Sequence, residues 1–242
     1  MLVPKPVLLT LAFVVAQSFV PQTACDRRVP PPSQTDPWAN APITETATTG
    51  DGVRLGVQVL LTNVQIPWAL AFAPDGRLFF TERPGRVRVV VNGTLLAQPA
   101  LTLPDVRAVG EGGALGLALH PNFAQNRFVF IAYTATRTNG TPVNRVVRYR
   151  EANNVFAEPA IILDNIHAAD NHNGARVRFG PDGKLYVTMG DAGDADLAQV
   201  LSSLNGKILR INDDGTTPAD NPFGSPVWTW GHRHPQGIDW NP

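Results

Sequence analysis

"ARVRFGPDGKLYVTMGD", residues 175–191, contains two short apolar segments joined by Pro181, Asp182 and Gly183. In the first segment arginines alternate with apolar residues, which is the period of two expected for a β-strand. Proline fixes its φ angle, aspartate bonds to nearby backbone, and glycine accepts a positive φ, so the three residues predict a tight turn. The stretch therefore predicts a β-hairpin.

The same layout occurs three more times along the chain. Residues 68–90 read "WALAFAPDGRLFFTERPGRVRVV", residues 115–134 read "LGLALHPNFAQNRFVFIAYT", and residues 235–242, "PQGIDWNP", begin the pattern again. Repeats of about 50 residues built from short strands are typical of a β-propeller. A large β-sandwich with accidental similarity between hairpins is the weaker alternative. We expect an all-β β-propeller, present as an incomplete ring of about three to four blades.

The composition allows a folded domain and argues against one class of partner. Of the 242 residues, 43% are hydrophobic, which is enough for a core and too many for a disordered chain. Lys plus Arg and Asp plus Glu are both 20, so the formal net charge is zero. A nucleic-acid binder would normally carry a basic excess, so we expect no nucleic-acid partner.

The N-terminus predicts export. Lys5 precedes the apolar run "VLLTLAFVVA" (7–16), and small and polar residues follow it. The run is too short to span a bilayer comfortably, so residues 1–25 are interpreted as a cleaved signal peptide, with an uncleaved anchor as the alternative. We expect the protein in the periplasm or attached to the cell envelope.

The single cysteine, Cys25, excludes a disulfide within the chain. Its position resembles a bacterial lipoprotein box, in which the cysteine is lipidated; an ordinary signal with a nearby cysteine is the alternative. Residues 26–52 are rich in Pro, Thr and Ser without an apolar period, which predicts a linker. The folded domain is expected over residues 53–242.

Several motifs resemble one known family. "GHRHPQG" (231–237) is similar to a signature of the soluble quinoprotein glucose/sorbosone dehydrogenases, which include aldose sugar dehydrogenases. Further matches occur in the same order at residues 66–87, 110–130, 180–194 and 204–223. The likeness covers roughly residues 55–242.

This resemblance implies a six-bladed propeller with the quinone cofactor PQQ over its central channel. It also implies oxidation of an aldose at the anomeric carbon to the lactone, by hydride transfer to the quinone with a histidine base. His172 falls on that histidine. An unperturbed imidazole titrates near about pH 6.5, so part of it is neutral and able to accept a proton. A loop histidine bonded to Asp170 or to backbone is the alternative interpretation.

The resemblance implies roles for five more residues. Glu111, Asn171 and Asp191 fall on positions near the sugar, although a turn-forming role for Asp191 before Gly193 is an equal alternative. Cofactor binding is implied for Arg233 and His234. An arginine presents a planar fork of donors and stays charged, but it also suits a salt bridge between blades.

Departures from the family pattern limit these implications. His234 stands where the family usually has asparagine, and Asn171 stands where the glucose enzyme has aspartate. Most ligands of PQQ, and the loop for its calcium ion, are expected beyond Pro242, so the chain alone is expected to be inactive. An exported propeller that binds sugar or a protein partner without catalysis is the main alternative, and a calcium-dependent hydrolase is a third.

Overall fold

The computed structural model describes residues 9–16 and 42–241 of the chain. Cys25, and most of the segments interpreted as signal peptide and linker, lie outside the described residues. Within the described part the structure is almost entirely β. The two helices found there are single short turns, α1 (Phe123–Asn126) and α2 (Ala195–Gln199).

Three antiparallel sheets make up the body of the molecule, and in each the strands pair mainly in chain order. The first contains β4 (Pro67–Phe72), β5 (Leu78–Glu82), β6 (Arg86–Val91) and β7 (Thr94–Leu95), with β8 (Leu101–Thr102) also on β6. The second contains β9 (Ala114–Leu119), β10 (Phe128–Thr136), β11 (Pro142–Ala152) and β12 (Val155–His167). The third contains β13 (Gly174–Phe179), β14 (Leu185–Met189), β15 (Lys207–Ile211) and β16 (Val227–Trp230).

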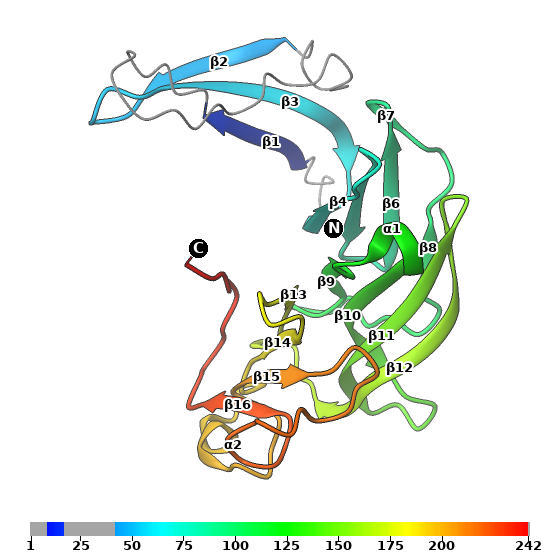
Figure 1. Cartoon of the computed structure of the whole chain (residues 1–242), viewed down its shortest axis with the longest axis vertical. Helices are drawn as coiled ribbons and strands as arrows, with labels where there is room; N and C mark the ends of the chain where they lie inside the picture. The colour runs from blue at the N-terminus through cyan, green and yellow to red at the C-terminus, as the bar shows by residue number, and fades with distance from the viewer. Residues whose placement is uncertain (1–8, 17–41, 242) are drawn as a thin grey trace, which may run out of the picture.

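The sheets stand side by side as blades of a β-propeller, in an arc that is open on the side of the C-terminus (Figure 1). The first strand of each sheet lies toward the inside of the arc, where β9 contacts both β4 and β13. This arrangement confirms the predicted all-β propeller and its three to four blades.

The predicted turns join the first two strands of the first and third sheets. At Pro74–Gly76 the N–H of Ala73 donates to the carbonyl of Arg77 at 2.8 Å, and Gly76 has a φ of 84°. The N–H of Gly180 likewise donates to the carbonyl of Lys184 at 2.9 Å. The recurring Pro-Asp-Gly sequence therefore makes the same hairpin in both blades.

Apolar side chains between neighbouring sheets hold the blades together. Between the first two sheets Phe79 packs against Phe123 and Phe156, with ring centroids 6.2 and 5.3 Å apart. Between the second and third sheets Phe130 meets Phe179 at 5.2 Å. Burying rings of this size supplies much of the stabilisation of a propeller, because each sheet has two apolar faces to cover.

A smaller sheet precedes the blades. It consists of β1 (Leu9–Ala16), β2 (Ile43–Thr48) and β3 (Arg54–Val64), with β3 in the centre. The end of the predicted linker, residues 43–48, is thus paired as a strand, because its three threonines, at every second position, favour an extended chain along β3. The cleavage of residues 1–25 stays a prediction.

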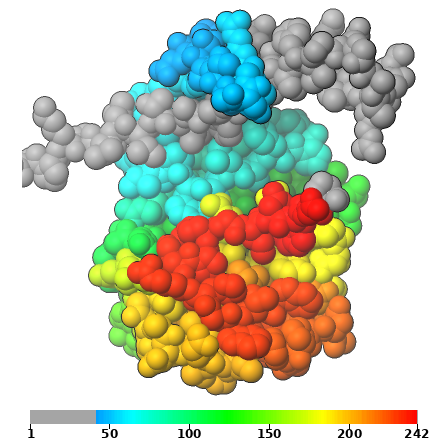
Figure 2. Space-filling view, turned by 90° about the vertical axis from the view of Figure 1, so that its left-hand side faces the viewer, coloured from blue at the N-terminus to red at the C-terminus, as the bar shows by residue number. Residues whose placement is uncertain are grey.

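Residues 231–241 follow β16 and return to the inside of the arc. Arg176 on β13 donates from Nε to the carbonyl of Gln236 at 3.1 Å, and Arg178 donates to the carbonyl of Ile238 at 3.3 Å. Figure 2 shows this segment, in red, lying across the surface over part of the yellow residues. The motif at 231–237 is thereby brought next to the loop that contains His172.

Candidate functional site

His172 lies in the loop between β12 and β13, and its ring contacts a buried carboxylate. The ring is 11% exposed, and its Nδ1 is 2.8 Å from Oδ1 of Asp191, whose side chain is 4% exposed. Asp191 follows β14, and the same oxygen accepts the N–H of Gly193 at 2.8 Å. A carboxylate with a fixed position and two donors therefore faces one nitrogen of the imidazole.

This contact fixes the proton arrangement of a neutral His172. An ionised carboxylate only accepts hydrogen bonds, so Nδ1 must carry the proton that is donated to it. Nε2 is then the unprotonated nitrogen, and it has no hydrogen-bond partner among the described residues. The arrangement is that of a general base whose free nitrogen can take a proton.

Two glycines allow the loops around His172 to approach this closely. A Cβ atom on Gly190 would overlap the carbonyl oxygen of His172, and one on Gly110 would overlap the carbonyl oxygen of Asp170. Gly110 also has a φ of 56°, in the left-handed region that favours glycine. Larger residues at either position would push the His172 loop away from its neighbours.

Glu111 precedes β9 and reaches the His172 loop from the second blade. Its Oε2 accepts the backbone N–H of His172 at 2.6 Å and lies 3.3 Å from Nε2 of His234. Its own N–H donates to the carbonyl of Asp170 at 2.7 Å. The carboxylate is 48% exposed, and it bridges two histidines that come from different segments.

His234 stacks on His172. The two ring centroids are 5.3 Å apart with an angle of 28° between the planes. Burial lowers the pKa of His234 below its usual range, and the nearby Glu111 carboxylate opposes this effect. Nδ1 of His234 is buried and has no hydrogen-bond partner in the described part of the chain.

Arg233 is placed beside the base by its backbone. Its carbonyl accepts the N–H of Asp191 at 2.8 Å, while its side chain is exposed to solvent. The salt bridge between blades that the sequence allowed for Arg233 is absent among the described residues. Its guanidinium is thus free to bind an anion from solution.

Sequence resemblance also implied positions near the sugar for Asn171 and Asp191, and the structure places these two side chains differently. Asn171 is exposed, and its side-chain oxygen is close to Gly193 rather than in the hollow described next. Among the described residues the Asp191 side chain makes hydrogen bonds only to His172 and Gly193, which favours orienting the imidazole over contacting a sugar. The turn-forming alternative for Asp191 also holds, because its contact to Gly193 closes that turn.

A hollow of about 490 Å³ opens beside Glu111 and His234. Its other lining residues come from the first and third blades and the segment after β16: Ile66, Trp68, Arg83, Gly110, Gly174 and Gln236. Sequence analysis assigned no role to Trp68, Arg83 or Gln236, although each lies inside a motif quoted for the family resemblance. Their presence in these motifs could have drawn attention to the three residues. A motif does not show, however, which of its side chains face the hollow.

Arg83 holds the loop that carries Glu111. Its Nη1 donates to the carbonyls of Gly110 and Gly112 at 2.5 and 2.9 Å. Because Arg83 follows β5 and these carbonyls precede β9, the contact joins the first blade to the second at the site. Arg83 therefore contributes both to the wall of the hollow and to the position of Glu111.

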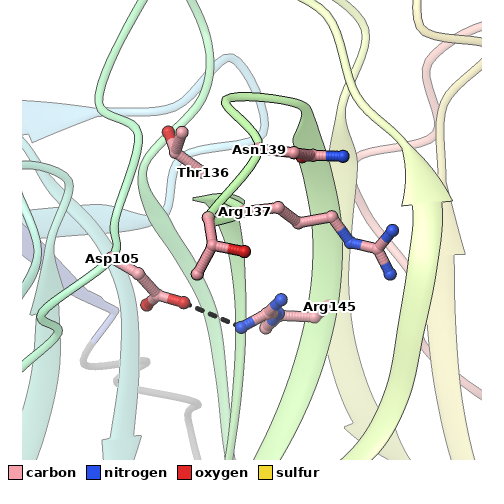
Figure 3. A pocket seen from close by; sticks show the side chains of 6 residues that line it. Asp105, Thr136, Arg137, Asn139 and Arg145 are labelled. Atoms are coloured by element: carbon pink, nitrogen blue, oxygen red, sulfur yellow. Dashed lines mark hydrogen bonds and ion pairs between the residues drawn. The ribbon is translucent and has the colours of Figure 1, made fainter.

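A second hollow, of about 440 Å³, lies at the turn between β10 and β11 (Figure 3). Arg145 donates there to Asp105 at 2.7 Å and to Asp164 at 3.1 Å, and Tyr133 donates to Asp105 at 3.1 Å. None of the six predicted site residues lines it. Because its charges neutralise one another, it is a weaker candidate than the hollow at His234.

Two searches of the described residues gave negative results. No group of three or more His, Cys, Asp or Glu side chains there is arranged to hold a metal ion. No helix in that part of the chain is long and apolar enough to cross a membrane.

Comparison with known proteins gives consistent matches. Residues 64–242 match the family model described as glucose/sorbosone dehydrogenase. The chain is 33% identical over 207 residues to aldose sugar dehydrogenase YliI of Escherichia coli, covering 78% of this chain and 54% of that protein. It is 31% identical over 218 residues to quinoprotein glucose dehydrogenase B of Acinetobacter calcoaceticus, covering 76% and 46%.

A solved structure with bound cofactor is similar as well. The PQQ-bound aldose sugar dehydrogenase of Streptomyces coelicolor superposes with a TM-score of 0.66 at 33% identity, covering 80% of this chain and 55% of that one. The chain thus spans about half the length of the relatives it matches.

Proposed function

The chain belongs to the glucose/sorbosone dehydrogenase family, and on that premise we propose that it supplies the catalytic base of a PQQ-dependent dehydrogenase acting on aldose sugars. The observation that carries the proposal is the contact between His172 and Asp191, which leaves Nε2 of His172 as a free proton acceptor. The relatives named above act on sugars or carry PQQ, and their names support this substrate class and this cofactor.

The residues present fit the cofactor. PQQ is a planar quinone that carries carboxylates, so it needs cationic donors and hydrogen-bonding side chains around a wide opening. The exposed Arg233 guanidinium meets the first need, and the neutral His234 ring, with its unpartnered buried nitrogen, is a hydrogen-bonding side chain of the second kind. His234 lines the hollow of about 490 Å³ together with Trp68 and Arg83, whereas Arg233 lies outside this lining. Arg233 and His234 would hold the group.

When bound, PQQ supplies an acceptor for the hydride that leaves the anomeric carbon. Nε2 of His172 would take the proton of the anomeric hydroxyl, which oxidation of the sugar to the lactone requires. Asp191 keeps Nδ1 protonated and stabilises the imidazolium that forms. Asn171 precedes this histidine in the chain and is exposed, so its amide is available to contact the sugar, although it lies outside the hollow.

The sharpest test replaces the base in the complete gene product with PQQ and calcium added. His172→Ala should abolish dye reduction with sugars, while PQQ binding followed by isothermal titration calorimetry stays within about threefold. His167→Ala is the matched control, because His167 is exposed. Turnover by His172→Ala would overturn the role of the base, and lack of PQQ binding by the wild type would favour a non-catalytic propeller.

Export is part of the same proposal. The apolar segment after Lys5 and the position of Cys25 support secretion, and lipidation at Cys25 would attach the protein to the cell envelope. Cell fractionation of the wild type and of Cys25→Ser tests this. A wild-type protein found in the cytoplasm would refute export, and an unchanged membrane fraction for Cys25→Ser would refute the lipid anchor.

A requirement for calcium is also part of the proposal. Dialysis against a chelator before the dye assay tests it.

A further inference from the structure

One carboxylate oxygen at the site serves two histidines. Oε2 of Glu111 is the acceptor for the N–H of His172 at 2.6 Å and lies 3.3 Å from Nε2 of His234. The first distance is short for a bond between an N–H and an oxygen, as expected when the acceptor is ionised. The loop of the base is thus attached, through a single side chain of the second blade, to the segment after β16.

The surroundings of His234 determine which of its nitrogens carries a proton. Nδ1 is buried without a partner, so a proton there would be a buried donor with no acceptor. A proton on Nε2 instead has the Glu111 carboxylate nearby, with Oε2 at 3.3 Å. The side-chain nitrogen of Gln236 lies 2.5 Å from the same Nε2 and could only donate to it. With the amide turned so that its oxygen faces the ring, Gln236 accepts from a protonated Nε2.

The charges around His234 agree with a neutral ring of this kind. Burial favours the neutral ring, as do the positive charges on two neighbours, His172 when protonated and Arg233, while Glu111 and Asp191 act in the opposite direction. Arg83 adds a further positive charge in the lining of the hollow. A neutral imidazole with its proton on Nε2 keeps its N–H on the side of the Glu111 carboxylate, 3.3 Å away, without requiring a change in net charge.

We propose that Glu111 is a positioning residue for His172, held in place by the neighbouring His234, and that it does not bind the sugar. The proposal rests on the proposed function, because it takes His172 as the base. It also reassigns Glu111, for which sequence resemblance implied contact with the substrate. Glu111 fixes the backbone of the base through the N–H of His172.

The test begins without cofactor or substrate, so that it does not depend on the proposed function. In ¹H–¹⁵N spectra of the complete gene product, the amide proton of His172 should be shifted downfield by its short hydrogen bond. Glu111→Ala should remove that shift, and Glu111→Gln, which keeps an acceptor oxygen, should retain part of it. An amide shift unchanged in Glu111→Ala would overturn the proposal.

The contribution of His234 is tested in the same spectra. His234→Ala should reduce the downfield shift of the His172 amide, and His234→Gln should restore it, because the glutamine amide can donate from a similar position. His167→Asn is the control and should change nothing, since His167 is exposed. Equal shifts in His234→Ala and wild type would show that His234 does not hold Glu111.

Kinetics of the cofactor-loaded enzyme separate positioning from substrate binding. With the aldose that the wild type oxidises fastest, Glu111→Ala should lower kcat about 10- to 100-fold, as for the loss of one charge-assisted hydrogen bond. KM should stay within about twofold. A raised KM with unchanged kcat would instead make Glu111 a substrate ligand, and unchanged values of both would leave it without a role.

Discussion

Oδ1 of Asp191 lies 2.8 Å from Nδ1 of His172, and both side chains are largely buried. The two residues come from different loops of the third blade, one before β13 and the other after β14. Their contact sets the imidazole tautomer, and a second residue from the neighbouring blade, Glu111, fixes the backbone of the same histidine. The base is therefore held on two sides by carboxylates.

Asp191→Asn should lower kcat without preventing folding. Asparagine has the same shape, but its amide can turn its N–H₂ group toward Nδ1, which favours the wrong tautomer of His172. Since a positioned general base contributes about 10²- to 10⁴-fold, we expect a fall in kcat in that range. Steady-state dye reduction measures it, and circular dichroism of the variant checks the fold. A fall of less than about threefold would mean that Asp191 does not orient the base.

Arg233→Ala should weaken binding of PQQ and leave protein stability unchanged. The Arg233 side chain is exposed and has no recorded ion pair in the described part of the chain, so its loss breaks no contact within the fold. Losing a charge-assisted hydrogen bond to an anionic ligand should raise Kd about 10- to 100-fold. Calorimetric titration with PQQ checks this, with Arg150→Ala at an exposed pair with Glu158 as the control. Equal Kd values for Arg233→Ala and wild type would remove Arg233 from the cofactor site.

Gly190→Ala should destabilise the protein and displace His172. A Cβ atom at Gly190 would overlap the carbonyl of His172, so the loop must shift, at a cost of about 1–3 kcal/mol. The free energy of unfolding in urea measures the cost. Gly50→Ala is the matched control, because a Cβ atom there meets nothing within 4 Å. Equal stability of the two variants would show that the close approach at Gly190 is absent in solution.

Arg77 pairs with Asp75 in its own turn and with Glu151 on the second blade, and its removal should change the pH dependence of stability. It donates to Glu151 at 2.7 Å and to Asp75 at 2.8 Å. The hydrogen bond from Arg77 lowers the pKa of Asp75 from its ordinary 3.8. For Glu151 burial acts to raise the pKa, but the bonds from Arg77 and from the N–H of Asn154 outweigh it, so the net shift from the ordinary 4.5 is downward.

Asp75 and Glu151 both have lowered pKa values in the folded state, so their ionised forms stabilise the fold. This stabilisation is complete above about pH 4.5 and is lost as the pH falls through the pKa values of the folded protein. Arg77→Met should cost about 3 kcal/mol at pH 7, because it leaves the buried Glu151 carboxylate with only the more distant Arg127, at 3.8 Å. The difference from wild type should shrink as the pH falls, because Glu151 loses its main cation in the variant and takes up a proton at a higher pH than in the wild type, where Arg77 lowers its pKa. Glu158→Gln, which removes the exposed ion pair with Arg150, should cost about 0.5 kcal/mol or less at any pH. A constant difference across the pH range would refute the pairing.

Local sequence determined the strands, the turns and the number of blades. Alternating residues such as those at 175–179 and the Pro-Asp-Gly turns act over a few positions, so their structure follows from nearest-neighbour sterics and hydrogen bonding. The order of motifs was enough to identify the family and to single out His172. The strand at residues 43–48 was missed, because its pairing depends on the distant β3 rather than on its own apolar pattern.

Only the tertiary structure decided what each polar residue contacts. Asp191 is 19 positions from the histidine it orients, and Glu111 is 61 positions away from the same histidine. Contacts at such separations depend on how loops of different blades meet, which is set by the packing of whole sheets. The sequence resemblance grouped Glu111, Asp191 and His234 with His172, and the structure brings all three into contact with that histidine. The shared oxygen of Glu111 and the free nitrogen of His172 became visible only in the folded chain.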